Sequence, residues 1–207
     1  MKPADRVNVT VGSMMLAYPL LAHAAVWWHT PVLEWVALTL LAVIPLVRSL
    51  FRLRIWAWAL AFVVAAGLYL LTSVGGGIYA LYLPSILIPG LLLWVFASSL
   101  RPGRVPLITE IARRTRKSMS PRLETYCHRL TVLWILLFAV MVIAALGFIA
   151  AGQRELWSLQ TNLLNYIACG LMFAGDHVYR VWRMREEPHP RFIEYLGIVA
   201  RSGVRRP

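Results

Sequence analysis

The chain has 207 residues, of which 59% are hydrophobic and only 14% carry a charged side chain, and its net charge is +12. Soluble domains carry about 45–50% apolar and about 25% charged residues. This chain therefore has too few charges to cover a compact soluble protein and too much apolar surface for a disordered one. The composition excludes both classes and predicts a protein embedded mainly in lipid.

Six apolar segments are long enough to cross a bilayer as helices, which takes about 20 residues for roughly 30 Å of hydrocarbon. They lie at 11–29, 32–50, 55–73, 78–99, 130–151 and 158–179. Pro84 and Pro89 make the fourth segment the one most expected to be kinked or broken. Only the connection at 101–129 is long, and a tail follows at 180–207. We therefore expect an all-α integral membrane protein that forms a single membrane domain over residues 1–207.

The positions of Lys and Arg predict the orientation of the chain. If the N-terminus lies in the cytoplasm, 20 of the 21 Lys and Arg residues lie on the cytoplasmic side, and Arg154 alone lies on the outer side. Because Lys and Arg in short loops stay on the cytoplasmic side, we expect a multi-pass protein with both termini in the cytoplasm. This orientation explains the positive charge without a nucleic-acid partner. The first 24 residues imitate a cleavable signal peptide, but the apolar run continues through Val26-Trp27-Trp28, so we expect it to be retained as the first span.

The sixth segment carries polar side chains along one helical face. At 100° per residue, an arc of about 80° holds Asn162, Asn165, Cys169, Met172, Asp176 and Arg180. Lipid offers polar groups no partner, so this stripe is expected to face other helices. Asn162 and Asn165 either join helices by hydrogen bonds or line a pocket for a head group or substrate. Asp176 is expected to pair with Arg180. His23 in the first span is expected to bond to a neighbouring helix, with a proton-linked role as the alternative.

The loop at 101–129 contains a segment typical of a short amphipathic cytoplasmic helix, at residues 106–118. Its apolar positions share one face, and its cations gather toward its C-terminal end, where they oppose the helix dipole favourably. Two interpretations stay open: the segment binds the anionic head groups of membrane lipids, or it docks an acidic soluble protein such as an acyl carrier protein. The cations available for either role are Arg101, Arg104, Arg113, Arg114, Arg116 and Lys117.

Four blocks of sequence carry a resemblance to a known family. They are Tyr18-Pro19-Leu20-Leu21-Ala22-His23, Arg101-Pro102-Gly103-Arg104-Val105-Pro106-Leu107-Ile108 with its flanking residues, Asn162-Leu163-Leu164-Asn165-Tyr166, and Tyr179-Arg180. Together they resemble an uncharacterised family of bacterial inner-membrane proteins encoded within aryl-polyene and related fatty-acid-like pigment clusters. The resemblance implies a neighbourhood of acyl carriers, ketosynthases and acyltransferases and a lipid-like product. It implies no particular activity.

Two classes of function follow from these features. The first is a non-catalytic accessory or scaffold for aryl-polyene or lipid-like acyl-chain biosynthesis, which docks acidic soluble partners through the basic loop. The alternative is an integral-membrane enzyme, a transporter or a flippase that handles a lipid-like intermediate through Asn162, Asn165, Asp176 and His23. The sequence holds no His-x-x-x-x-Asp motif, no Asp-x-x-Asp pair and no histidine box for iron. We therefore expect no metal and no cofactor, and the absence of these motifs favours the non-catalytic class.

Overall fold

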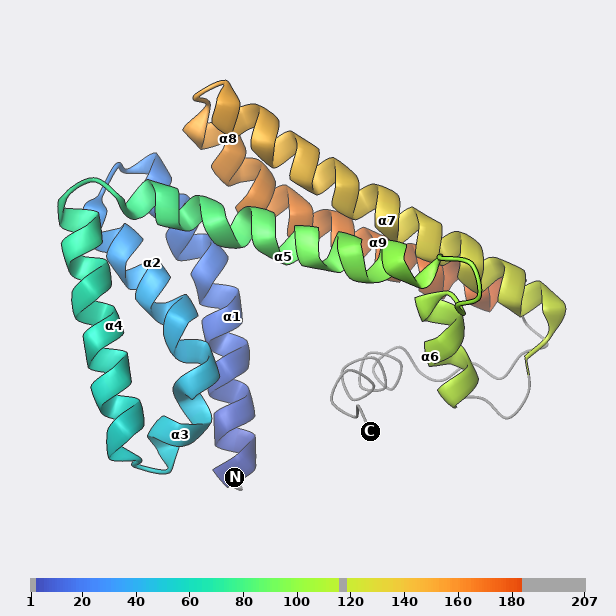
Figure 1. Cartoon of the computed structure of the whole chain (residues 1–207), viewed down its shortest axis with the longest axis horizontal. Helices are drawn as coiled ribbons and strands as arrows, with labels where there is room; N and C mark the ends of the chain where they lie inside the picture. The colour runs from blue at the N-terminus through green and yellow to red at the C-terminus, as the bar shows by residue number, and fades with distance from the viewer. Residues whose placement is uncertain (1–2, 116–118, 184–207) are drawn as a thin grey trace. The chain divides into compact units, whose positions relative to one another are not determined.

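The computed structural model of the chain describes residues 3–115 and 119–183, and all regular structure within these ranges is helical (Figure 1). The predicted all-α class is therefore confirmed for this part of the chain. Arg116, Lys117 and the tail from residue 184 lie outside the described residues. The elements are α1 (Pro3–Trp27), α2 (Pro31–Val43), η1 (Ile44–Leu46), α3 (Val47–Phe51), α4 (Ile55–Ser73), α5 (Gly77–Ser99), α6 (Leu107–Thr115), α7 (Pro121–Ala150), α8 (Arg154–Leu159), η2 (Gln160–Leu164) and α9 (Asn165–Arg183).

Within the described residues, five helical segments are long and apolar enough to cross a membrane. Between 11% and 28% of each apolar window is buried within the protein, so most of these side chains face outward. An apolar surface of this extent is typical of a protein solvated by lipid. These segments overlap the first five predicted spans. Their bounds are Asp5–Trp27, Pro31–Phe51, Ile55–Ser73, Gly77–Ser99 and Pro121–Ala150.

Helix α7 begins much earlier than the predicted fifth span, at Pro121 rather than at residue 130. Its 30 residues extend about 45 Å at the usual helical rise, which exceeds the roughly 30 Å of hydrocarbon. The local cause is a helix start: Ser120 Oγ accepts a hydrogen bond from the Leu123 amide at 3.3 Å, and Pro121 occupies the first helical position. The first turns of α7 therefore form an extension beyond its apolar part.

The interruption expected in the fourth span occurs instead in the sixth. Helix α5 is continuous from Gly77 to Ser99 although it contains Pro84 and Pro89, because neighbouring groups can satisfy the backbone that a proline frees in a membrane helix. The segment predicted at 158–179 is divided among α8, the π-helical turn η2 and α9. In η2 the Asn165 amide donates to the carbonyl of Gln160, five residues earlier. A turn of this kind holds one more residue than an α-helical turn.

The described helices form two compact units. The first is made by residues up to Leu87 together with Ile143–Tyr166, and the second by Ile88–Val142 together with the residues from Ile167 onward. The prediction of one membrane domain stays a prediction. The core of the first unit contains Tyr18, Ala22, Val26, Ala37, Leu38, Ile78, Leu81, Ala145 and Trp157. The second unit has a core along α7 formed by Leu130, Trp134, Phe138 and Met141, with Phe96, Met172 and Phe173 packed against it.

Candidate functional site

A buried polar cluster in the first unit joins α1 to the α8–η2 segment. His23 Nδ1 lies 3.0 Å from Ser158 Oγ, and the Asn162 amide nitrogen donates to the same hydroxyl oxygen at 3.2 Å. Ser158 is completely inaccessible to solvent, and Asn162 is buried. The Ser158 hydroxyl thus links His23 on α1 to Asn162, the first residue of the predicted polar stripe. The predicted bond from His23 to a neighbouring helix is confirmed.

The residues beside Ser158 hold this cluster in place. Trp157 is buried and donates its indole N–H to Ser85 Oγ at 3.1 Å. Its ring meets the edge of Tyr82 with the ring centroids 4.6 Å apart. Thr161 Oγ1 donates to the carbonyl of Trp157 at 2.8 Å. A side chain that bonds one turn back competes with the helical backbone, and this contact lies where the π turn begins.

The π turn changes which residues of the predicted stripe lie together. The stripe assumed a constant 100° per residue from Asn162 onward, whereas η2 contains one extra residue in its turn. Asn165 Oδ1 accepts a hydrogen bond from Gln160 Nε2 at 2.9 Å, and Asn162 bonds to Ser158 instead. Asp176 belongs to the second unit. The structure therefore brings His23 and Asn162 together through Ser158, and it gives Asn165 and Asp176 separate partners.

The chemistry of the first cluster supports two roles. A hydroxyl within hydrogen-bond distance of an imidazole is the basic arrangement by which enzymes activate a serine nucleophile, and a further group usually orients the imidazole. The same bonds also satisfy polar groups that lipid would leave without partners. Structural hydrogen bonding accounts for these contacts, with His23–Ser158 and Trp157–Ser85 joining helices and the others lying within the α8–η2 segment and its junction with α9, whereas catalysis needs an additional route for a substrate.

A second polar cluster joins α7 to α9 in the second unit. Asp176 Oδ1 accepts from the Tyr126 hydroxyl at 2.6 Å and from Arg180 Nε at 2.8 Å. The Asp176 side chain is 3% exposed and that of Arg180 is 12% exposed. The guanidinium carbon lies 5.6 Å from the centre of the Tyr126 ring, and that ring stacks on Tyr179 at 4.7 Å. The predicted pairing of Asp176 with Arg180 is confirmed, with Tyr126 as a third member.

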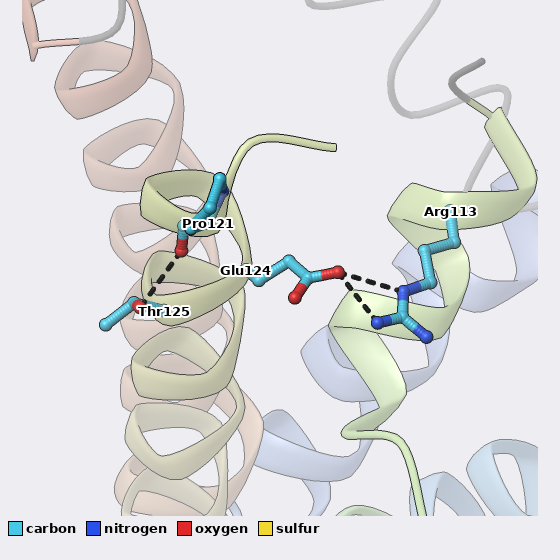
Figure 2. Close-up of polar contacts among 4 residues, drawn as sticks. All are labelled: Arg113, Pro121, Glu124 and Thr125. Carbon is cyan, nitrogen blue, oxygen red and sulfur yellow. Dashed lines mark hydrogen bonds and ion pairs between the residues drawn. The ribbon is translucent and has the colours of Figure 1, made fainter. Parts of the chain in front are cut away.

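Helix α6 is fixed to the extension of α7 by apolar and ionic contacts. Ala112 packs with Leu123 and Cys127, and Ile108 borders this cluster. Figure 2 shows Arg113 reaching across to Glu124, with Nε at 3.2 Å and Nη2 at 2.7 Å from the same carboxylate oxygen. The figure also shows the Thr125 hydroxyl donating to the Pro121 carbonyl within α7 at 3.0 Å. A helix is thus present within the predicted 106–118, and its apolar face contacts protein.

The cations of the predicted docking loop remain accessible. Arg101 and Arg104 are exposed in the connection between α5 and α6. Arg113 and Arg114 each form an ion pair, the latter with Glu110 at 2.6 Å, yet their side chains are still 49% and 55% exposed. Exposed ion pairs contribute only about 0–1 kcal/mol each, so a partner's carboxylates can replace them at little cost. Arg116 and Lys117 lie outside the described residues.

Sequence analysis missed Tyr126, whose partner Asp176 is 50 residues away along the chain. The spacing of Arg122, Tyr126 and Arg129 carries a signal, since residues four and seven apart share one helical face. Ser120-Pro121 signals the helix start that brings them onto α7. Among residues 3–115 and 119–183, no group of three or more His, Cys, Asp or Glu side chains is placed to hold a metal ion.

Comparisons with protein-family models, with curated proteins and with solved structures find no match to this chain.

Proposed function

We propose that this chain is a six-span protein of the bacterial inner membrane with both termini in the cytoplasm. Five of the crossings are supported by the five candidate segments. The sixth is supported by α9, because Cys169, Met172 and Phe173 pack along the apolar part of α7. A helix that packs against the membrane-crossing part of α7 lies at the same depth. Asp176, His177, Arg180 and Arg183 make the second half of α9 polar, which explains why hydropathy alone does not identify it.

A reporter experiment tests this topology. Fusions of a compartment-sensitive reporter after residue 76 and after residue 115 should report opposite sides of the membrane. A fusion after residue 183 should agree with the one after 115, because α9 returns the chain to the side of α6. Fusions at 76 and 115 that report the same side would refute the proposal, and a fusion at 183 that disagrees with 115 would remove the sixth crossing.

We propose further that the protein is a non-catalytic accessory component that docks an acidic soluble partner at the membrane. The observation that carries this proposal is the attachment of α6 to α7. The attachment uses the apolar face of α6 and leaves the guanidinium groups accessible on a fixed support. A complementary acidic surface is attracted to such a patch and associates faster at low ionic strength. The resemblance described above suggests an acyl carrier protein or a synthase component of aryl-polyene or lipid-like assembly.

Charge reversal in the exposed connection tests the docking proposal. The variant Arg101→Glu/Arg104→Glu should lose the salt-sensitive capture of carrier protein by the purified membrane protein, with membrane levels unchanged. The matched control is Arg52→Glu/Arg54→Glu, which reverses two exposed cations in another connection predicted to be cytoplasmic. The control should retain capture. Equal capture by both variants, or capture that does not weaken with salt, would refute docking at this surface.

The cluster of half-buried His23 with buried Ser158 and Asn162 favours a second candidate, an enzyme or carrier that acts on a lipid-like intermediate. The supporting observation is the imidazole-to-hydroxyl distance of 3.0 Å beside a π turn, a feature frequent at functional sites. In this case His23→Ala and Ser158→Ala should each abolish the product while protein levels stay normal. Normal product with either variant would exclude catalysis there. In a deletion strain, finished product accumulating in the inner membrane would instead indicate export.

A further inference from the structure

A groove of about 680 Å³ runs between α7 and α9 in the second unit. Its volume lies within the range of small-molecule sites, about 300–1,000 Å³. Both helices are packed together along the core beside it. The groove is lined by Arg122, Thr125, Tyr126, Arg129, Leu130, Leu133, Leu171, Met172, Gly175, Asp176 and Tyr179.

The lining changes from polar to apolar along the groove. On α7 the residues from Arg122 to Arg129 are polar or aromatic, and Leu130 and Leu133 follow them. On α9 the order is reversed, with Met172 before Asp176. The contact of Tyr126 with Asp176 shows that the polar ends of the two helices meet. The groove thus has one polar and one apolar end, the arrangement that suits an amphiphile.

The polar end has an excess of positive charge. Asp176 is already balanced by Arg180 at 2.8 Å and by the Tyr126 hydroxyl at 2.6 Å. Arg122 and Arg129 both line the groove with exposed side chains. They are seven positions apart, which places their Cα atoms about 10 Å apart on one face of the helix. Two guanidinium groups at this spacing can approach one phosphate from both sides, with the bidentate geometry that arginine favours.

The apolar end continues into lipid-facing surface. Leu133 is 50% exposed and Leu171 is 67% exposed, and Leu133 lies in the part of α7 that sequence analysis placed within the bilayer. A soluble anion would fill the arginine end and leave the leucine end in contact with water or lipid. The acyl chain of a lipid covers the leucines. The head group of the same lipid then lies at the depth where the hydrocarbon ends.

We propose that this groove is a binding site for one anionic phospholipid. Its phosphate lies between Arg122 and Arg129, and one acyl chain lies along Leu130, Leu133 and Leu171. The proposal rests on membrane insertion and is independent of the docking surface formed by the α5–α6 connection and α6, whose cations Arg101, Arg104, Arg113 and Arg114 do not line the groove. The bound lipid fills the open space between α7 and α9.

The test measures how much lipid the full-length protein retains. The protein is released from mixed micelles, and native mass spectrometry counts the lipid molecules that stay bound to it. Phosphatidylglycerol and phosphatidylcholine with identical acyl chains are compared. The wild-type protein should retain one phosphatidylglycerol selectively. Each basic residue near a membrane surface contributes about 1 kcal/mol toward anionic lipid, so Arg122→Gln/Arg129→Gln should weaken that retention by about 30-fold. The control, Arg101→Gln/Arg104→Gln, should retain lipid like the wild type, although it removes two cations of the docking surface.

A second variant tests the acyl chain separately from the charge. Leu133→Trp fills the apolar end from an exposed position and should lower phosphatidylglycerol retention at least tenfold without changing the net charge. Millimolar inorganic phosphate should not displace the lipid. Equal retention by the wild type and the arginine variant would overturn the proposal. Displacement by phosphate together with normal retention by Leu133→Trp would also overturn it, because the site would then belong to a soluble anion.

Discussion

Two ion pairs of the same spacing but different burial give a direct test of how the second unit is stabilised. Asp176–Arg180 and Glu110–Arg114 are both i,i+4 pairs, at 2.8 Å and 2.6 Å. The side chains of the first pair are 3% and 12% exposed, and those of the second are 45% and 55% exposed. A difference in their energetic coupling therefore reports burial together with the contacts that Tyr126 makes with both members of the buried pair.

The perturbation is a double-mutant cycle on each pair. Asp176→Ala leaves the Arg180 guanidinium buried beside a Tyr126 hydroxyl that has lost its acceptor. Breaking a buried pair by removing one partner costs about 3–5 kcal/mol. Asp176→Ala/Arg180→Met removes the buried charge, so the remaining loss is mainly the unsatisfied hydroxyl, about 1–3 kcal/mol. We therefore expect the double variant to be no less stable than Asp176→Ala, and a coupling energy of about 2 kcal/mol or more.

Glu110→Ala, Arg114→Met and their combination provide the control cycle. The exposed pair should contribute about 0.3–0.5 kcal/mol. The measurement is the free energy of unfolding in mixed micelles, taken from SDS titrations followed by circular dichroism. Coupling energies that are equal within error for the two pairs would refute the reasoning, as would a loss below about 1 kcal/mol for Asp176→Ala.

Two further predictions concern the first unit and the π turn. Ser158→Ala should lower the unfolding free energy by about 1–3 kcal/mol, because His23 and Asn162 lose their shared partner in a buried setting; an unchanged melting temperature would contradict this. Deleting Leu164 removes the extra residue of the π turn and should be tolerated. Deleting Val140 from the continuous helix α7 rotates residues 141–150 by about 100° and should be strongly destabilising. Both residues are exposed, so equal melting temperatures for the two deletions would show that the π turn does not absorb a deletion.

Five of the six predicted spans overlap helices long and apolar enough to cross a membrane, because hydrocarbon thickness sets a minimum apolar length. The same rule misplaced the start of α7, since a helix does not have to end where hydrocarbon ends. The cap Ser120 and the first-turn Pro121 were available in the sequence and mark the observed start. Hydropathy describes where a chain prefers lipid, and capping residues describe where a helix begins. The two signals diverge at α7 because this helix extends beyond its apolar segment.

The polar stripe was only partly predictable, for a different physical reason. The pair of Asp176 and Arg180 depends on spacing within one helix and was correctly predicted. The π turn accompanies buried side chains that bond to the backbone and to α1, as Thr161 bonds to Trp157 and Ser158 contacts His23. Those partners are tertiary and have no local signature. Periodicity extrapolated through such a turn places Asn162 and Asp176 on one line, although each has its own set of contacts.

The extension of α7 connects the proposed docking surface to the proposed lipid groove, because different faces of the same helical turns carry them. Leu123 and Cys127 contact α6, whereas Arg122 and Arg129 line the groove. Adjacent residues point about 100° apart on a helix, so a few turns beyond the apolar part are enough to present both surfaces. Shortening α7 to the length that hydrocarbon requires would remove both surfaces and leave the crossing intact. The length of α7 beyond its span is thus better explained by what it supports than by membrane insertion.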